Sequence, residues 1–149
     1  KEVDNYAKKF YITLCIEPLN RFECYFLNTI KDAYDYVKLV NEDNFKILYD
    51  TFHSNIEEKD PVGSISKFSD KIGHIHISEN DRGVPGKGNI PWSETFQAIQ
   101  KINYKGWLTI EAFGRSLPDL AAATKVWRDF FSSEEEVYQE GINFIKKNL

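Results

Sequence analysis

Short apolar runs, rich in β-branched and aromatic residues, recur along the chain and are its strongest local pattern. Each run has the length of one strand. Such runs are typical of strands that are buried on both faces of a parallel sheet. We therefore predict four strands, near residues 11–16, 45–50, 72–77 and 107–111.

Segments with a helical period follow these runs. In the first, the apolar residues Ile30, Ala33, Val37 and Val40 fall on one face of a helix. Residues 1–10 resemble the end of a polar helix, and further helices are predicted over 29–40, 61–68, 92–102, 117–131 and 134–147. The strands recur roughly every 30 residues, which is about the length of one βα unit. This alternation predicts an α/β fold with a parallel sheet and right-handed crossovers.

Polar residues at the strand ends distinguish an open doubly wound sheet from a barrel. No G-x-G-x-x-G or P-loop sequence follows any predicted strand, so the usual nucleotide signatures are absent. One acidic or imidazole residue instead lies at or just past each strand end: Glu17, Asp50, His76 and Glu111, here called the strand-end quartet. Four such ends converge on one rim if the strands curl into a barrel, whose active sites lie at that face. We predict a (β/α) TIM-barrel fold over residues 1–149.

The chain supplies only half of such a barrel. Four βα units are predicted, whereas a closed (β/α)8 barrel has eight. The inner face of the sheet and its two edges would then need covering. The chain also begins at Lys1 and contains no Met. We expect it to be a piece of a longer protein that includes an N-terminal half-barrel, or to pair with a second copy in a homo-oligomer.

Composition narrows the classes of function. The net charge is −4 and no long basic run occurs, which argues against nucleic-acid binding. No apolar stretch is long enough to cross a membrane. Cys15 and Cys24 are the only cysteines, too few for a disulfide scaffold, so a cytoplasmic location is expected. The aromatic share of 15% suits either a large core or a carbohydrate site.

The donor types of the strand-end quartet indicate a metal. Any one such residue after a strand is more often an ordinary loop or capping residue, but four at successive strand ends favour a common site. Three carboxylates and one imidazole suit Mn²⁺, Co²⁺ or Mg²⁺ with coordination positions left for substrate oxygens. A structural Zn²⁺ would prefer a closed set of Cys and His. The sequence therefore predicts one divalent ion at the barrel mouth.

Four motifs carry a resemblance to a known family. They are IEPLNRFE (Ile16–Glu23), DTFH (Asp50–His53), GHIHISENDRGVPGKG (Gly73–Gly88) and IEAF (Ile110–Phe113). These motifs are similar to those of the ketose 3-epimerases that act on D-tagatose and D-psicose, which have xylose-isomerase-like TIM barrels. The resemblance spans roughly residues 14–128. It implies that the chain corresponds to the C-terminal half of the barrel, strands five to eight.

The resemblance also implies roles for individual residues. The whole strand-end quartet would ligate the metal, most often Mn²⁺, with Co²⁺ or Mg²⁺ as alternatives. Glu17 and Glu111 would in addition form the acid/base pair. Glu23, His53 and Arg82 would hydrogen-bond the sugar near C1 to C3. His74, the first residue of the H-x-H sequence, would not be a ligand.

The reaction explains why two carboxylates are needed. A proton on C3 beside a ketone becomes acidic enough when a divalent ion stabilises the enediolate. Epimerisation then requires one carboxylate to take the proton and a second to return one to the other face. Another sugar or hydroxypyruvate isomerase of the same superfamily, and a non-catalytic half-barrel fragment, remain alternatives. A DNA-repair endonuclease on a related barrel is disfavoured, because the chain has only three His and a negative charge.

Overall fold

Four parallel strands form the centre of the structure, a computed structural model that describes residues Lys1–Leu149. They are β1 (Leu14–Ile16), β2 (Phe45–Asp50), β3 (Ile72–Ile77) and β4 (Leu108–Ile110). The strands lie side by side in the order in which they occur in the sequence, and every neighbouring pair is parallel. Sequential order with right-handed crossovers is the topology of a (β/α) barrel. The predicted α/β half-barrel is confirmed, with four βα units.

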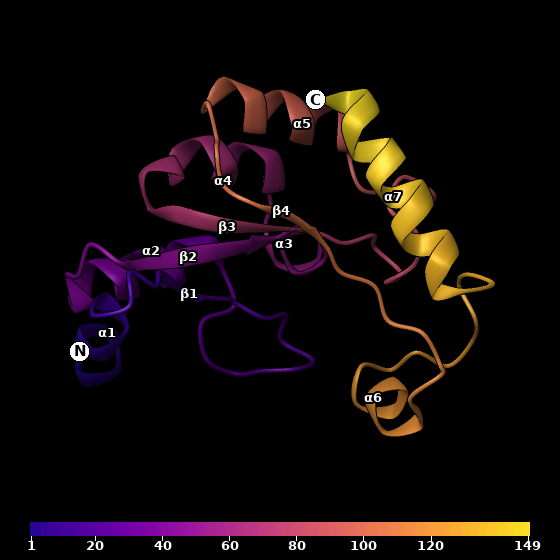
Figure 1. Cartoon of the computed structure of the whole chain (residues 1–149), viewed down its shortest axis with the longest axis horizontal. Helices are drawn as coiled ribbons and strands as arrows, with labels where there is room; N and C mark the ends of the chain where they lie inside the picture. Colours follow the sequence, from indigo (N-terminus) through magenta and orange to yellow (C-terminus); the bar gives the residue numbers. More distant parts are fainter.

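Helices connect and flank the strands (Figure 1). Their bounds are α1 Glu2–Lys8, α2 Ile30–Val40, α3 Thr51–Glu57, α4 Pro61–Lys67, α5 Trp92–Lys101, α6 Pro118–Ala123 and α7 Glu134–Asn148, with a 3₁₀ turn at Ser69–Lys71. In Figure 1, α4 and α5 cover one side of the sheet, α7 lies beside its β4 end, and α6 stands apart from the sheet. None of these helices combines the length and the apolar character that crossing a bilayer requires.

Local sequence accounts for the ends of the longer helices. Thr29 and Asp32 form a capping box at the start of α2, and Asn41 ends that helix in the left-handed conformation. Ser133 caps α7, whose first turn is acidic and whose last turn carries two lysines. Acidic residues at the start of a helix and basic residues at its end both interact favourably with the helix macrodipole.

The core lies between the sheet and the helices. Ile47, Tyr49, Ile75 and Ile77 point from β2 and β3 toward the helices and are almost fully buried. The helices contribute the rest of the core: Ile30, Ala33, Val37, Ile65, Phe96, Ala98 and Ile99. Because side chains alternate along a strand, burying these positions directs their neighbours to the opposite face. That alternation aims the functional side chains away from the helices.

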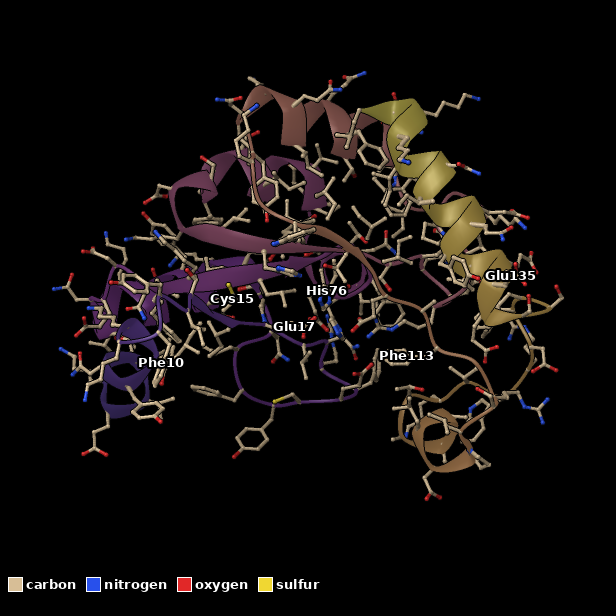
Figure 2. The ribbon with its side chains drawn as sticks, viewed as in Figure 1. Phe10, Cys15, Glu17, His76, Phe113 and Glu135 are labelled. Carbon is tan, nitrogen blue, oxygen red and sulfur yellow. The ribbon has the colours of Figure 1, made fainter.

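The face of the sheet that points away from the helices carries half-buried and exposed side chains. Leu48 and His74 are half-buried, and Thr109 is exposed. Thr109 Oγ1 lies 3.0 Å from His74 Nε2 on this face. Figure 2 shows Cys15, Glu17 and His76 on the side of the sheet away from α4 and α5. In a closed barrel this face would be the interior.

The first strand and the sixth helix are shorter than predicted. β1 begins at Leu14 because residues 10–12 complete the turn after α1, with Tyr11 in the left-handed conformation. The helix predicted over 117–131 stops after Ala123. The chain reverses there through Lys125, at φ 62°, and Val126 N donates to Ala121 O. Residues 124–133 contain no helix.

The helix α3 was not predicted from the sequence. It begins immediately after β2, without the intervening loop that usually signals a new element. Asp50 makes this possible, because its carboxylate accepts hydrogen bonds from the backbone N–H groups of Phe52 and His53. A side-chain cap of this kind satisfies the first free donors of a helix.

Candidate active site

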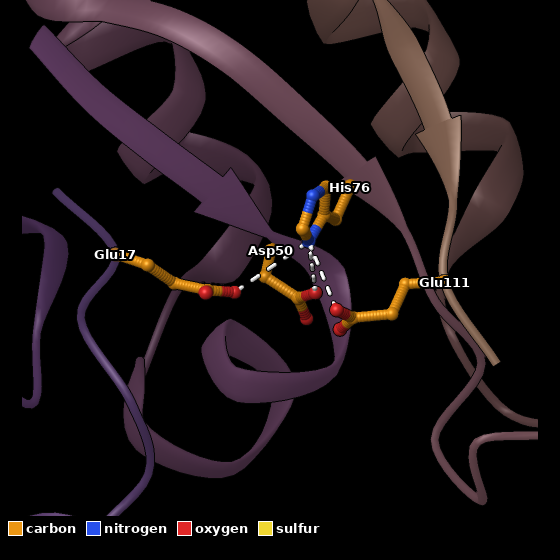
Figure 3. Close-up of side chains that lie close together, drawn as sticks. All are labelled: Glu17, Asp50, His76 and Glu111. Carbon is orange, nitrogen blue, oxygen red and sulfur yellow. Dashed lines mark ion pairs between the residues drawn. The ribbon is translucent and has the colours of Figure 1, made fainter. Parts of the chain in front are cut away.

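The strand-end quartet lies together at the C-terminal edge of the sheet. Glu17 directly follows β1, Asp50 ends β2, His76 is the last but one residue of β3, and Glu111 directly follows β4. Asp50 and His76 are paired across neighbouring strands. Figure 3 shows Glu17 and Glu111 approaching from opposite sides, with Asp50 and His76 between them. The parallel register therefore brings together the four residues that the sequence placed at strand ends.

One imidazole nitrogen lies at the centre of the group. His76 Nδ1 is 3.4 Å from Asp50 Oδ2, 3.5 Å from Glu111 Oε1 and 3.6 Å from Glu17 Oε1. One donor atom from each of the four residues lies within 4.8 Å of every other. Two donors about 2.1 Å from one ion stand roughly 3 Å apart when adjacent and 4.2 Å apart when opposite. The spacing therefore fits a single divalent ion after a small contraction.

Three buried atoms of the quartet lack hydrogen-bond partners, which also supports a site for a divalent ion. Glu17 Oε1, Asp50 Oδ2 and His76 Nδ1 are buried, and none has a hydrogen-bond partner. Buried polar atoms are nearly always paired, because an unpaired one costs about 1–3 kcal/mol. Three such atoms facing one another are what a cation site requires. This donor set fits the predicted Mn²⁺, Co²⁺ or Mg²⁺.

Asp50 divides its two oxygens between structure and site. Oδ1 caps α3, while Oδ2 faces His76 and Arg82. Its side chain is fully buried, and this burial raises the pKa of Asp50 to about 6, although His76 and Arg82 oppose the shift. The cap holds the carboxylate in one orientation, so its free oxygen is fixed before any ligand arrives.

The charged neighbours of His76 and Glu111 favour a protonated His76 imidazole and an ionised Glu111. Burial alone would lower the pKa of His76, but contacts with Asp50, Glu111 and Glu17 raise it to about 11. Burial would raise the pKa of Glu111, but His76 and Arg82 lower it to about 2. In the metal-free chain a proton on His76 therefore offsets part of the carboxylate charge.

Metal binding is expected to compete with that proton. A ligating imidazole must be deprotonated, and the pKa of His76 lies well above neutral pH. The affinity for Mn²⁺ should then rise about tenfold per pH unit between pH 6.5 and 8.5. Titration calorimetry in buffers of different ionisation enthalpy should report about one proton released for each Mn²⁺ bound. An affinity that does not change over this pH range would contradict the arrangement.

Arg82 is fixed beside the quartet by contacts on several sides. Nη1 donates to Ser78 Oγ at 3.0 Å and to Glu111 Oε2 at 2.5 Å. The guanidinium carbon lies 3.7 Å from the centre of the Phe52 ring and 4.8 Å from that of Phe113. Cation–π contacts of this kind strengthen as water is excluded. The guanidinium is thus held in place, with Nη2 turned toward His53.

His53 lies next to Arg82 and is buried. Its Nε2 is 3.1 Å from Arg82 Nη2 and 3.8 Å from Glu17 Oε1. Burial, with the positive charge of Arg82, lowers the pKa of His53 to about 4. The ring is therefore neutral at physiological pH. Of the three predicted sugar-binding residues, His53 and Arg82 thus lie at the quartet.

Glu23, the third predicted sugar-binding residue, lies on the exposed loop between β1 and α2. It is connected to His53 through Asn20, whose Nδ2 is 2.9 Å from both Glu23 Oε1 and His53 Nδ1. Four residues of this region were not singled out from the sequence: Asn20, Phe52, Ser78 and Phe113. All four lie within the motifs already recognised, but no pattern of hydrophobicity distinguishes them.

A buried carboxylate organises the loop that carries Arg82. Glu79 is fully buried after β3, and each of its oxygens accepts two hydrogen bonds. The donors are the backbone N–H groups of Asn80, Gly86 and Ile90 and the indole of Trp92. A Cβ at Gly88 would lie 2.5 Å from Glu79 Oε1, so only glycine allows this approach. The loop after β3 is therefore built around one acidic side chain.

Replacing Glu79 with Gln should destabilise the chain by about 2–4 kcal/mol. The new NH₂ group would face donors, and the bonds lost are made to a charged, buried acceptor. The free energy of unfolding in urea measures the effect. Glu94→Gln, an exposed change in the first turn of α5, serves as the control and should alter it by less than about 0.5 kcal/mol. Equal stability of the two variants would contradict the role of Glu79.

Known proteins are similar to this chain in sequence and in fold. Residues 1–148 match the family described as xylose isomerase-like TIM barrel. The chain belongs to this family. Its resemblance to the ketose 3-epimerases is also confirmed: a D-psicose 3-epimerase of Enterocloster bolteae is 42% identical over 129 residues, which are 87% of this chain and 43% of that protein. An L-ribulose 3-epimerase of a Methylomonas species is 32% identical, over 96% of this chain and 51% of that protein.

Solved structures agree with the sequence relatives. The structure of an L-ribulose 3-epimerase superposes on this chain with a TM-score of 0.94 at 34% identity. The superposition covers 99% of this chain and 50% of the L-ribulose 3-epimerase. The D-psicose 3-epimerase of Clostridium cellulolyticum H10 with D-tagatose gives 0.89 at 38% identity, covering 99% and 52%. The chain thus spans about half the length of the relatives it matches. It is a half-barrel aligned with ketose 3-epimerases.

Proposed function

We propose that this half-barrel carries the metal ligands and the acid/base pair of a metal-dependent ketose 3-epimerase. The observation that supports the proposal most directly is the opposed placement of Glu17 and Glu111. They follow the two outermost strands of the sheet, yet one oxygen of each lies within 3.6 Å of the same imidazole nitrogen. Two carboxylates that flank one small site from opposite sides are what inversion of a carbon centre needs.

The chemistry assigned to these residues is proton transfer at C3 of a free ketose. One of Glu17 and Glu111 removes the C3 proton, and the other returns a proton to the opposite face. Glu111 is ionised at neutral pH, because its pKa is lowered to about 2 despite burial. A divalent ion held by the strand-end quartet supplies stabilisation of the negative charge that develops on the sugar oxygens. Reversal of the roles of the two glutamates runs the reaction backward.

The sugar-binding assignments rest on hydrogen-bond donors beside the quartet. Arg82 and His53 present nitrogens next to Glu17 and Glu111 and are held rigidly by their neighbours. We assign them to oxygens near C1 to C3, with Glu23 at the outer end of the same network. Rigid donors aimed at developing negative charge lower a barrier without reorganisation during the reaction.

Mn²⁺ is the ion proposed for the site, with Co²⁺ and Mg²⁺ as the other candidates. Carboxylate oxygens suit all three, and the imidazole of His76 favours the two transition metals. Activity restored by each ion after treatment with EDTA would rank them.

The closest rival is another isomerase of the same superfamily, acting on a different carbon of a sugar or on hydroxypyruvate. Incubation with D-fructose, D-psicose and D-tagatose plus Mn²⁺ in D₂O separates the two. Deuterium at C3, with interconversion of the C3 epimers, is the expected result. Exchange confined to C1 would exclude the epimerase.

The pocket is proposed to need a second half. Because the chain spans about half the length of its relatives, either an N-terminal half-barrel or a second copy would cover the inner face of the sheet. Sedimentation and turnover measured together distinguish these states. An active dimer supports the homo-oligomer, whereas an inactive monomer that binds no metal would support a non-catalytic fragment.

A further inference from the structure

Asn20 is a buried polar residue for which the proposed reaction has no role so far. It lies on the loop between β1 and α2 and is only 1% exposed. It contacts both His53 and Glu23, which come from different parts of the chain and were assigned to the sugar. A buried amide between two binding residues can control how both of them are presented.

The neighbours of Asn20 determine which way its amide points. Oδ1 lies 3.0 Å from the backbone N–H of Phe22, which can only donate. Nδ2 lies 2.9 Å from Glu23 Oε1, which as a carboxylate accepts. The opposite orientation would place two donors together and two acceptors together. The NH₂ group therefore faces both Glu23 and His53.

This orientation determines where His53 carries its proton. Two groups of Asn20 approach His53 Nδ1: the backbone nitrogen at 3.1 Å and Nδ2 at 2.9 Å. Both are donors, so Nδ1 must offer its lone pair and hold no hydrogen. The ring hydrogen is then on Nε2.

In that tautomer the protonated Nε2 of His53 faces Arg82. Arg82 Nη2 lies 3.1 Å from His53 Nε2, and a guanidinium can only donate. Two N–H groups thus face one another with no acceptor between them. Arg82 cannot turn away easily, because Ser78, Glu111 and two aromatic rings hold it. The nearest carboxylate oxygen to His53 Nε2, Glu17 Oε1, is 3.8 Å away, too far for a hydrogen bond.

We propose that Asn20 is a positioning residue that holds His53 as the Nε2–H tautomer, so that His53 and Arg82 donate together to one oxygen of the ketose. The shared oxygen supplies the acceptor that the two facing N–H groups lack. Both donors then stabilise negative charge that forms on this oxygen. The inference rests on the proposed function for the identity of that oxygen. The tautomer itself rests only on the contacts of Asn20.

Nitrogen-15 NMR of the imidazoles tests the tautomer directly. The chain has only three His, so substitution of each assigns the spectrum. In the unsubstituted chain, without metal or sugar, His53 Nδ1 is expected at the shift of an unprotonated nitrogen and Nε2 at that of a protonated one. Protonation of Nδ1 in this sample would overturn the proposal, whatever the variants do.

The Asn20→Asp variant places an acceptor against Nδ1 and should move the His53 proton onto that nitrogen. Asn28→Asp is the matched control, because Asn28 lies on the same loop and donates only to the carbonyls of Leu19 and Cys24. It should leave the His53 shifts unchanged. Unchanged shifts in N20D, or equal changes in both variants, would reduce Asn20 to a structural residue.

Turnover of D-psicose with Mn²⁺ provides the second measurement. N20D is expected to lower kcat by about 10- to 100-fold, the usual effect of losing a residue that orients a catalytic group, with N28D close to the unsubstituted chain. A kcat for N20D equal to that of N28D would overturn the proposal. Failure of the unsubstituted chain to turn over any ketose counts against the proposed function instead, and the NMR result then decides the role of Asn20 independently.

Discussion

Replacing Glu111 with Gln is expected to lower ketose turnover by about 10³-fold, and to weaken Mn²⁺ binding as well. The amide cannot accept the C3 proton, and one of the three quartet carboxylates loses its charge. The change also removes the charged partner of Arg82 Nη1, now 2.5 Å from Glu111 Oε2. Deuterium incorporation at C3 of D-psicose in D₂O measures the first effect, and calorimetric titration with Mn²⁺ measures the second.

The control for this experiment is Glu135→Gln. Glu135 lies in the first turn of α7, is exposed, and accepts a hydrogen bond from Gln139 on its own helix. This variant should exchange C3 at the rate of the unsubstituted chain. Exchange retained at more than about one tenth of that rate in E111Q would refute the acid/base role of Glu111.

Saturation with Mn²⁺ is expected to stabilise the fold substantially. At a concentration 100 times the Kd, an ion bound only by the folded chain adds about 2.7 kcal/mol to the free energy of unfolding. For a chain of this size the midpoint of thermal unfolding should rise by about 5–10 °C. The physical source is relief of three buried, unpaired donor atoms at the quartet. EDTA should reverse the shift completely.

Asp50→Asn should abolish this stabilisation without removing the helix cap. Asn caps helices about as well as Asp, so α3 remains capped while the charge facing His76 is lost. Asp60→Asn is the matched control, because Asp60 caps α4 through Gly63 N and has no contact with the quartet. A Mn²⁺ shift that persists in D50N, or disappears equally in D60N, would contradict the metal site.

The two central strands were predicted more accurately than the two outer ones. The predicted ranges 45–50 and 72–77 match β2 and β3 residue for residue, because both strands are buried against helices on one face. The prediction for β1 was wrong at its start, since the apolar residues near Tyr11 belong to the turn after α1. α3 was missed because the signal for it is one capping carboxylate at Asp50, which composition alone does not reveal.

The sequence indicated which residues form the site. It did not indicate how their individual atoms are arranged. Parallel strands bring their C-terminal ends to one edge, so residues at four successive strand ends could be grouped from the order of the strands alone. The sequence could not say that Asp50 uses only one oxygen toward the group, or that Glu79 holds the Arg82 loop. Those facts depend on distances between residues far apart in the chain.

The apolar runs, together with the polar residues at their ends, determined from the sequence that this chain forms a parallel α/β half-barrel with an acidic group at one rim. Periodicity is a local property, and the crossover rule converts it into topology. Only the tertiary structure decided which side chains face one another. The contacts of Asn20 with His53 and of Arg82 with His53 and Glu111 each join separate elements of the fold. Hydrogen bonds are directional over a few ångströms, and no sequence pattern records that direction.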